Sequence, residues 1–473
     1  MKIIATLAAA FFTFCASAQT GYEIKVQLKP LKKQWVYLGH YYGKQLPIID
    51  SVLLNENSEG VLRGPKKLKG GIYLVGFPDR ARNFEILVDR AQRFTIVADT
   101  ARLDQTTFVN SPENTAFKAY QDYMTVNGRQ LDALYKQRGT LTGAEAEKNR
   151  TAIEGLNQTI RSYRDNIIRK DPESLLAVLL TAMREPEVPQ TPEARSDSTF
   201  AYRYFKQHYW DDVNFYDGRL VNTPFFEAKL DRYFEQLVYP SADSVIRELD
   251  WMLGYASIDT VMQQFLLVKF ANRYLNQKFM WEDKVFVHLF EKYFSNKSYT
   301  WLNDRGRKVL TDRAYSLMAN LTGNPASDIA LPDPSGKTAN LYEVAAPFTL
   351  VAIWDPTCGH CKEVMPKIDS LYEAKWKGLG MKVFAMAKET DGTKDTWLKF
   401  IKDHKLEKWT HVYYSKEAEK ARVDAGTPGY SQLYDVQSFP TLYLLDAEKR
   451  IIAKKVTEDQ INEILAYKLQ NTK

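Results

Sequence analysis

The segment "FTLVAIWDPTCGHCKEVMP", residues 348–366, constrains the fold more than any other stretch of the chain. Its first half is an apolar run typical of a buried strand, and it leads into a helical pattern that continues to about Trp376. Strand and helix patterns then alternate through "MKVFAMAK", "KDTWLKFIKDH" and "HVYYS" to a hairpin made of "FPTLYLLD" and "RIIAKKV". Thr457 and Gln460 have the spacing of a helix capping box. The alternation predicts an α/β domain whose central sheet is covered on both faces.

At 473 residues the chain is expected to form several domains. A Pro/Gly/Ser-rich segment at 322–337 separates the α/β region, 323–473, from a region at 111–322 in which apolar residues recur three and four apart. Ser111-Pro112 is a helix start, with Ser as N-cap and Pro at the first helical position. Residues 19–110 read as short, mostly alternating strands, which favours an antiparallel sandwich-like or barrel domain. The predicted fold is therefore multidomain, with antiparallel β, all-α and α/β domains in that order.

The first residues have the three parts of a secretory signal peptide, predicted to span 1–18. Lys2 supplies the positive start, an apolar run follows, and "ASA" ending at Ala18 is the cleavage site. Bulky Phe14, directly before Cys15, argues against a lipidation signal. The run is too short for an ordinary transmembrane helix, and no later segment is apolar enough. We therefore expect an exported protein of the periplasm or cell envelope, without a transmembrane segment in the mature chain.

The cysteine count narrows the chemistry. Of three cysteines, cleavage would remove Cys15 and leave Cys358 and Cys361. Exported proteins that depend on disulfides for stability carry more cysteines. A disulfide that closes a loop this small gives little entropic stabilisation, so a structural disulfide is a poor explanation for the Cys358–Cys361 pair. The formal net charge of +6, without a strongly basic cluster, does not suggest nucleic acid as a partner.

A CxxC pair where a strand meets a helix suits thiol–disulfide exchange. Unpaired N–H groups and the helix dipole favour a thiolate at Cys358, and protonated His360 adds positive charge beside it. Cys361, one turn deeper, is placed to resolve a mixed disulfide. Haem attachment would need a histidine where Lys362 stands, and a structural zinc would need four ligands. We expect no metal and no cofactor beyond a redox-active Cys358–Cys361 disulfide.

Three motifs, "DIALPDPSGKTANLYEV", "FTLVAIWDPTCGHCKEVMP" and "YDVQSFPTLYLLD", occur in that order between about residues 325 and 473. In this part the chain resembles the exported thioredoxin-fold thiol–disulfide oxidoreductases of Gram-negative envelopes, the TlpA/ResA-like group. The β-rich and helical regions before it resemble the N-terminal domains, of unassigned function, that some of these proteins carry. The resemblance implies protein thiols or disulfides as substrates and a membrane partner as electron donor.

The resemblance also implies roles for residues around the cysteines. Trp354 matches the family's tryptophan shortly before the first cysteine, and Pro366 matches the proline that kinks the active-site helix. Pro440 matches the cis-proline that faces the CxxC, and the backbone of Phe439 before it would pair with an extended substrate by strand addition. Gly359, with His360, forms the dipeptide also found in protein disulfide isomerase, which is more oxidising than thioredoxin.

Two positions depart from the family pattern. Ala352 stands where thioredoxins usually bury an acid, and Val364 stands where the envelope reductases often have a glutamate. Glu363 is one position off, about 100° around the helix. Glu389, after the second strand, is a candidate for the missing proton acceptor of the buried thiol.

We therefore expect an exported thiol–disulfide oxidoreductase that acts on envelope proteins through its CGHC motif, with reduction favoured over isomerisation or oxidation. The alternative is a binding or scaffold protein of the envelope, whose N-terminal domains recognise a partner and whose thioredoxin domain is secondary. The large part of the chain that precedes the CxxC motivates this second hypothesis.

Overall fold

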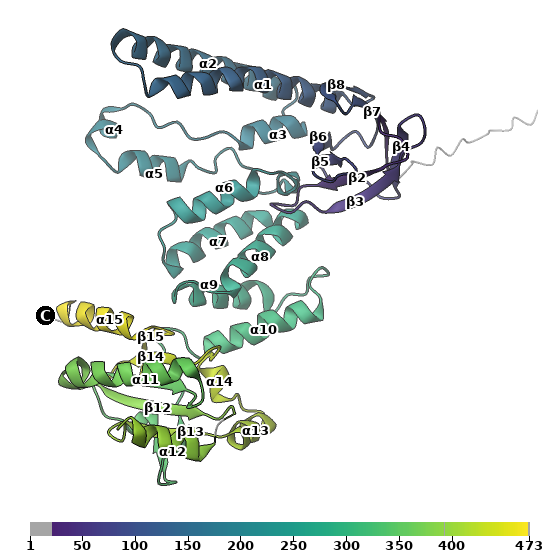
Figure 1. Cartoon of the computed structure of the whole chain (residues 1–473). Coiled ribbons are helices and arrows are strands. Elements are labelled where there is room, and N and C mark those ends of the chain that lie inside the picture. Colours follow the sequence, from purple (N-terminus) through teal and green to yellow (C-terminus); the bar gives the residue numbers. More distant parts are fainter. Residues whose placement is uncertain (1–20, 392, 472–473) are drawn as a thin grey trace, which may run out of the picture. The chain divides into compact units, whose positions relative to one another are not determined.

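The computed structural model describes residues 21–391 and 393–471. The predicted signal peptide and its cleavage site lie outside this part of the chain. Contacts divide the chain into two compact units, coloured along the sequence in Figure 1. The first unit runs up to Val238 and includes Trp251–Leu266, and the second comprises Tyr239–Asp250 and the chain from Leu267 on. The boundaries predicted from sequence patterns at 110 and 322 stay predictions.

The first unit begins with two β-sheets. Their strands are β1 (Tyr22–Lys29), β2 (Trp35–His40), β3 (Ile48–Leu53), β4 (Glu59–Gly64), β5 (Gly71–Gly76), β6 (Asn83–Val88), β7 (Arg93–Asp99) and β8 (Arg102–Val109). One sheet has the order β4-β1-β7-β8 and the other β3-β2-β5-β6. Alternate residues of β1, such as Ile24 and Val26, join Val36 and Leu38 of β2 in one shared core. Two sheets that pack on one core form a sandwich.

The prediction of an antiparallel domain is wrong for one pair of strands, because β1 and β7 run parallel. The remaining neighbours in the two sheets are antiparallel. Periodicity fixes which side of a strand is buried, but strand direction depends on where the chain re-enters the sheet. Here the chain leaves β1, builds the whole second sheet and strand β4 of the first, and returns as β7. This long connection makes a parallel pair possible.

Helices follow the sandwich. They are α1 (Pro112–Arg138), α2 (Gly143–Lys170), α3 (Leu175–Ala182), α4 (Pro192–Ser196), α5 (Phe200–Gln207), η1 (Gly218–Asn222), α6 (Phe226–Arg232) and η2 (Tyr233–Leu237), and then α7 (Ala242–Ala256) and α8 (Thr260–Leu275), which are divided between the units. The hydroxyl of Ser111 accepts a hydrogen bond from the backbone N–H of Asn114, and Pro112 is the first helical residue. The predicted helix start is thus confirmed.

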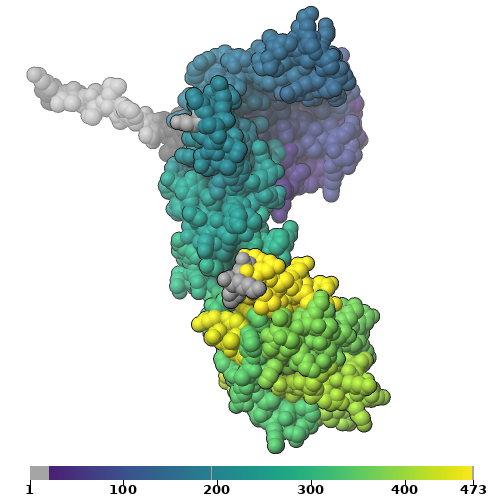
Figure 2. Space-filling model, turned by 90° about the vertical axis from the view of Figure 1, so that its left-hand side faces the viewer, coloured from purple at the N-terminus to yellow at the C-terminus, as the bar shows by residue number. Residues whose placement is uncertain are grey.

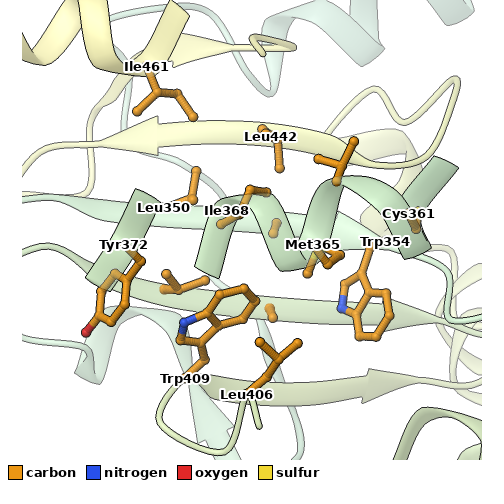
Figure 3. Packing of buried hydrophobic residues seen from close by; sticks show 14 of the residues in the cluster. Leu350, Trp354, Cys361, Met365, Ile368, Tyr372, Leu406, Trp409, Leu442 and Ile461 are labelled. Carbon is orange, nitrogen blue, oxygen red and sulfur yellow. The ribbon is translucent and has the colours of Figure 1, made fainter. Parts of the chain in front are cut away.

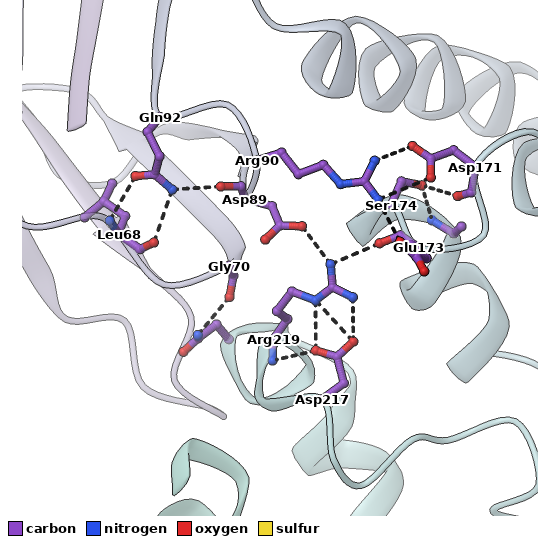
Figure 4. A network of polar contacts seen from close by, with 12 residues as sticks. Leu68, Gly70, Asp89, Arg90, Gln92, Asp171, Glu173, Ser174, Asp217 and Arg219 are labelled. Atoms are coloured by element: carbon purple, nitrogen blue, oxygen red, sulfur yellow. Dashed lines mark hydrogen bonds and ion pairs between the residues drawn. The ribbon is translucent and has the colours of Figure 1, made fainter. Parts of the chain in front are cut away.

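Arg219 of η1 joins the sandwich to the helices of the first unit (Figure 4). Its guanidinium contacts Asp217 at 2.6 Å and Asp89, which follows β6, at 2.7 Å. It also donates to the backbone carbonyl of Glu173, just before α3, at 3.2 Å. These groups are largely shielded from water, so Arg219 links three segments through charge-assisted hydrogen bonds.

The second unit contains α9 (Glu282–Leu289), η3 (Phe290–Phe294), α10 (Asp304–Met318), β9 (Ala330–Pro332), β10 (Thr338–Asn340), η4 (Leu341–Glu343), β11 (Thr349–Trp354), α11 (Gly359–Leu371), η5 (Tyr372–Trp376), η6 (Lys377–Leu379), β12 (Lys382–Lys388), α12 (Lys394–Asp403), β13 (Thr410–Tyr414), α13 (Lys416–Asp424), α14 (Tyr430–Leu433), β14 (Thr441–Leu445), β15 (Ile451–Lys454) and α15 (Glu458–Asn471). The strands of its main sheet have the order β13-β12-β11-β14-β15. β11, β12 and β13 run parallel, whereas β14 is antiparallel to both β11 and β15.

The central strand β11 is buried on both faces, as predicted from its apolar run. Leu350, Ala352 and Trp354 belong to one core, which includes residues of α11, α12 and α15 (Figure 3). Val351 and Ile353 belong to the opposite core, which includes Tyr430 of α14 and Tyr434 directly after it. Successive side chains of a strand point to opposite faces, so a continuous apolar run fits a sheet covered on both sides.

The last helix begins as predicted. The Thr457 N–H donates to Oε1 of Gln460 at 2.9 Å, and the Gln460 N–H donates to the Thr457 hydroxyl at 3.4 Å. These reciprocal bonds form the expected capping box. α15, yellow in Figure 2, lies on the surface of its unit.

Candidate active site

Cys358 lies where the central strand of the second unit becomes a helix. β11 ends at Trp354, and Cys358 is the N-cap of α11, with extended backbone dihedrals. Its backbone N–H donates to the carbonyl of Asp355 at 3.2 Å, which closes the turn between strand and helix. The thiol therefore lies at the end of the helix whose N–H groups have no partner within the helix.

The two thiols differ in their surroundings. Cys358 is partly exposed, whereas Cys361 is fully buried in the core that contains Trp354 (Figure 3). Burial raises the pKa of the Cys361 thiol to about 12 from its ordinary value of 9.0, and the backbone N–H of Asp355 opposes this only in part. An apolar environment disfavours the charged form, so Cys361 is a protonated thiol at neutral pH.

The loop before β14 covers the exposed thiol. β14 runs antiparallel to β11, so Thr441 at its start pairs with Ile353 near the end of β11. The peptide bond between Phe439 and Pro440 is cis. The Sγ of Cys358 lies 3.8 Å from the carbonyl oxygen of Phe439 and donates a weak hydrogen bond to it. Backbone of the cis-proline loop thus lies directly against the thiol.

A groove of about 220 Å³ opens beside this pair of segments. Exposed His360 and buried Val364 of α11 form part of it, and Pro440 forms another part. The rest of its lining is largely polar and comes from Gln437, Ser438, Thr441, Leu442, Lys455, Val456, Thr457 and Glu458. The groove can accept an extended segment next to the cis-proline loop.

The structure gathers the residues named from the sequence into two layers. At the surface, the carbonyl of Phe439 contacts the thiol of Cys358. The nearby groove is lined by His360 and Pro440. Gly359 is the first residue of α11, and Pro366 stands inside that helix. Trp354 lies in the core, where its ring is 4.8 Å from that of Phe400. Trp354 and Pro366 are therefore placed to support the site rather than to touch a substrate.

Sequence reasoning missed Asp355, which is only 5% exposed. Its Oδ1 accepts hydrogen bonds at 2.7 Å from both the N–H and the hydroxyl of Thr357, and its Oδ2 accepts one from Thr390. The negative charge of Asp355 adds to the rise in the pKa of Cys361. An acid directly after a buried strand and three residues before the first cysteine was the available signal.

The alternative acids lie elsewhere. Glu389 accepts from the backbone N–H of Lys416 at 3.3 Å, and Glu363 is exposed on α11. Ala352 and Val364, where the family often has an acid, are both buried in the core. By contrast, the charge of the Asp355 carboxylate contributes to the raised pKa of Cys361.

Among residues 21–391 and 393–471, no three His, Cys, Asp or Glu side chains are grouped so that they could hold a metal ion. Within the same part of the chain, no helix has the length and apolar character needed to cross a membrane.

A CxxC at the end of a central parallel strand, a cis-proline next to it and a closing antiparallel hairpin define a thioredoxin-like domain. The carboxy-terminal part of the chain therefore has a thioredoxin-like fold. Residues 144–318, before it, match the model of a domain of unknown function (DUF5106). The search of curated proteins gave no significant match.

Several solved structures are similar to parts of the chain. A thioredoxin-like protein from Bacteroides caccae is 21% identical over 60% of this chain and 98% of its own, with a TM-score of 0.45. A domain of a possible thiol-disulfide isomerase from Cytophaga hutchinsonii is 30% identical over 32% of this chain and 97% of its own, with a TM-score of 0.27. A thiol:disulfide interchange protein from Bacteroides sp. is 26% identical over 31% and 90%, with a TM-score of 0.26.

Proposed function

We propose that the protein is an exported, TlpA/ResA-like thiol–disulfide oxidoreductase that reduces disulfides of envelope proteins. The observation that carries the proposal is the partly exposed thiol of Cys358, whose Sγ lies 3.8 Å from the carbonyl oxygen of Phe439 in the cis-proline loop, together with the buried thiol of Cys361. An exposed nucleophile, a protected second thiol and a groove for an extended chain are the parts that disulfide exchange needs.

In the first step the Cys358 thiolate attacks one sulfur of a client disulfide. A mixed disulfide forms between Cys358 and the client, and the other client sulfur leaves as a thiolate that takes up a proton. Backbone groups at Phe439 hold the client's extended segment beside the nucleophile, as in strand addition. We propose that the nearby groove accepts neighbouring side chains of the client.

In the second step Cys361 loses its proton and attacks the Sγ of Cys358. The Cys358–Cys361 disulfide forms, and the second client sulfur leaves and is protonated. Two electrons pass from the protein to the client, so the client is reduced and the CGHC pair is oxidised. An external dithiol donor, which we propose to be a membrane partner, must then reduce the pair again.

The raised pKa of Cys361 makes its deprotonation the demanding part of the second step. We propose that Asp355 accepts that proton. It would do the work of the acids that related proteins have at the positions of Ala352 and Val364. Its burial and its electrostatic interaction with Cys361 support this role. A positioned general base contributes about 10²–10⁴-fold to a proton-transfer step.

A redox titration combined with insulin-reduction kinetics tests the proposal. We expect rapid reduction and a potential near the thioredoxin value of about −270 mV. A strongly oxidising potential without reductase activity would contradict the reductase assignment. The Cys358→Ser variant separates the enzyme from the scaffold hypothesis, because only the enzyme loses all function in vivo. The Cys361→Ser variant should trap clients as mixed disulfides.

A further inference from the structure

Asp435 occupies an unusual place between α14 and the cis-proline loop. Its side chain is 5% exposed, and its backbone φ is +43°, in the left-handed region that non-glycine residues seldom adopt. Its backbone N–H donates to the carbonyl of Gln432 at 3.1 Å. Such a backbone conformation persists only where the surroundings hold it, so the contacts of the Asp435 side chain matter for the five residues up to Pro440.

Arg313 of α10 is the principal partner of Asp435. Its Nη1 donates to Oδ1 of Asp435 at 2.6 Å, and its side chain is 15% exposed. Its Nε donates to the carbonyl of Leu275 at 3.1 Å, and its Nη2 donates to Gln277. All three guanidinium nitrogens are bound, so the planar head is held in one orientation.

Two further side chains of the same segment bind the end of α14. The Ser316 hydroxyl donates to the carbonyl of Gln432 at 3.1 Å, and the Asn320 amide donates to the carbonyl of Leu433 at 3.0 Å. Carbonyls in the last turn of a helix have no partner inside it. The region from α10 to Asn320 therefore supplies partners for the segment that precedes the cis-proline loop.

On its other side Asp435 binds two residues that line the groove. The Gln437 amide donates to Oδ1 of Asp435 at 3.2 Å, and the Lys455 ammonium donates to Oδ2. Gln437 and Lys455 line the groove together with His360 and Pro440. Burial raises the pKa of Asp435, but the hydrogen bonds from Arg313 and Lys455 outweigh this and lower it below its ordinary value. One buried carboxylate thus connects α10 to the groove.

We infer that Arg313 is a positioning residue for client binding: through Asp435 it orients the cis-proline loop and the polar wall of the groove formed by Gln437 and Lys455. The inference rests on the proposed function. The end of the helical region would then help to shape the site that binds the client. The thiol chemistry stays with the CxxC, since Arg313 contacts neither cysteine.

Steady-state kinetics of the full chain test this role with two substrates. Insulin needs the groove, whereas hydroxyethyl disulfide, a small disulfide, needs only the exposed thiol. For Arg313→Met we expect KM for insulin to rise about tenfold. The variant loses one charge-assisted hydrogen bond, and a loss of about 1.4 kcal/mol in binding free energy corresponds to a tenfold weaker affinity. kcat, the rate with hydroxyethyl disulfide and the CxxC reduction potential should stay within about twofold.

Arg313→Lys keeps one charged donor and should recover part of the KM. Arg305→Met, an exposed arginine on the same helix, is the matched control and should leave every parameter unchanged. Asp435→Asn should also raise KM for insulin while the protein stays folded. Circular dichroism with a thermal scan verifies that each variant is folded. If Arg313→Met is folded and leaves KM for insulin unchanged, the inference is wrong. If the wild type reduces neither substrate, the proposed function itself fails.

Discussion

Lys454 of β15 and Asp283 of α9 form a buried ion pair, with side chains 2% and 6% exposed. The Lys454 ammonium also donates to the backbone carbonyl of Asn320 at 2.8 Å. Burial lowers the pKa of Lys454, and Asp283 acts in the opposite direction. The lysine therefore depends on its carboxylate partner to stay charged inside the protein.

We expect Asp283→Ala to destabilise the second unit by about 3–5 kcal/mol, because it leaves a buried ammonium group without its partner. Urea unfolding followed by tryptophan fluorescence measures the loss. The double variant Asp283→Leu with Lys454→Met should lose less, since both charges are removed. Lys284→Met, which breaks an exposed pair with Asp243, is the control and should change stability by no more than about 0.5 kcal/mol. Equal losses for both single variants would contradict the burial argument.

His411 should make stability depend on pH. Burial lowers its pKa to about 4, from an ordinary value of 6.5. Between these values the unfolded chain binds a proton that the folded protein does not, so stability falls as the pH decreases. The linkage predicts a loss of about 2 kcal/mol between pH 7 and pH 5. His411→Gln should flatten this part of the profile, and an unchanged profile would refute the assignment.

The buried thiol should be slow to alkylate. In the reduced Cys358→Ser variant, Cys361 is the remaining thiol of the CxxC, and its pKa of about 12 leaves little thiolate at pH 8. We expect its reaction with iodoacetamide to be about a thousandfold slower than that of a free thiol, in proportion to the thiolate fraction, and to accelerate up to about pH 12. The Cys361→Ser variant, with exposed Cys358, is the comparison. A fast reaction at Cys361 at pH 8 would show that burial does not control this thiol.

The Asp355→Asn variant tests whether the Asp355 carboxylate accepts the proton of Cys361 or acts only through its negative charge. The substitution removes the negative charge that raises the pKa of Cys361, so charge alone would make the second step faster. If the Asp355 carboxylate takes the proton, the mixed disulfide should instead resolve about tenfold or more slowly. Stopped-flow decay of a mixed disulfide with a fluorescent peptide measures the rate. A faster decay would leave Asp355 an electrostatic role only.

Arg219→Met should destabilise the first unit by about 2 kcal/mol, because Asp89 and Asp217 would lose their shared partner in a mostly shielded position. Arg90→Met is the matched control: that arginine pairs with Asp171, but both side chains are about half exposed. The control should cost no more than about 0.5 kcal/mol. Thermal unfolding followed by circular dichroism compares the two variants.

Local patterns predicted several elements of both units well. The apolar run before the CxxC becomes β11, and the capping boundaries at Ser111 and Thr457 are present in the structure. Such features depend on residues close in sequence. The parallel pairing of β1 with β7 was not predictable in this way, because it depends on the path of about seventy intervening residues.

The candidate site divides in the same manner. Cys358 and Pro440 could be named from their motifs, but the part played by Asp355 depends on three-dimensional packing. The bond between Arg313 and Asp435 spans 122 positions. Asp435 stands in the motif "YDVQSFPTLYLLD", but Arg313 belongs to no motif, so nothing in the sequence indicated that the two residues meet. An arginine in an amphipathic helix resembles a solvated surface residue until the fold brings its partner beside it.

The hydrogen bonds from Arg313 and Ser316 have a consequence for how such a protein can change over evolutionary time. Both residues belong to the segment 144–318 that matches a family model of its own, yet their partners lie in the thioredoxin-like part. A helical segment imported from another protein would bring its own residues to these positions and leave Asp435 unmatched. Recombination in the segment 322–337 would therefore separate Arg313 from its hydrogen-bond partner Asp435. We expect the residues at positions 313 and 435 to be inherited together.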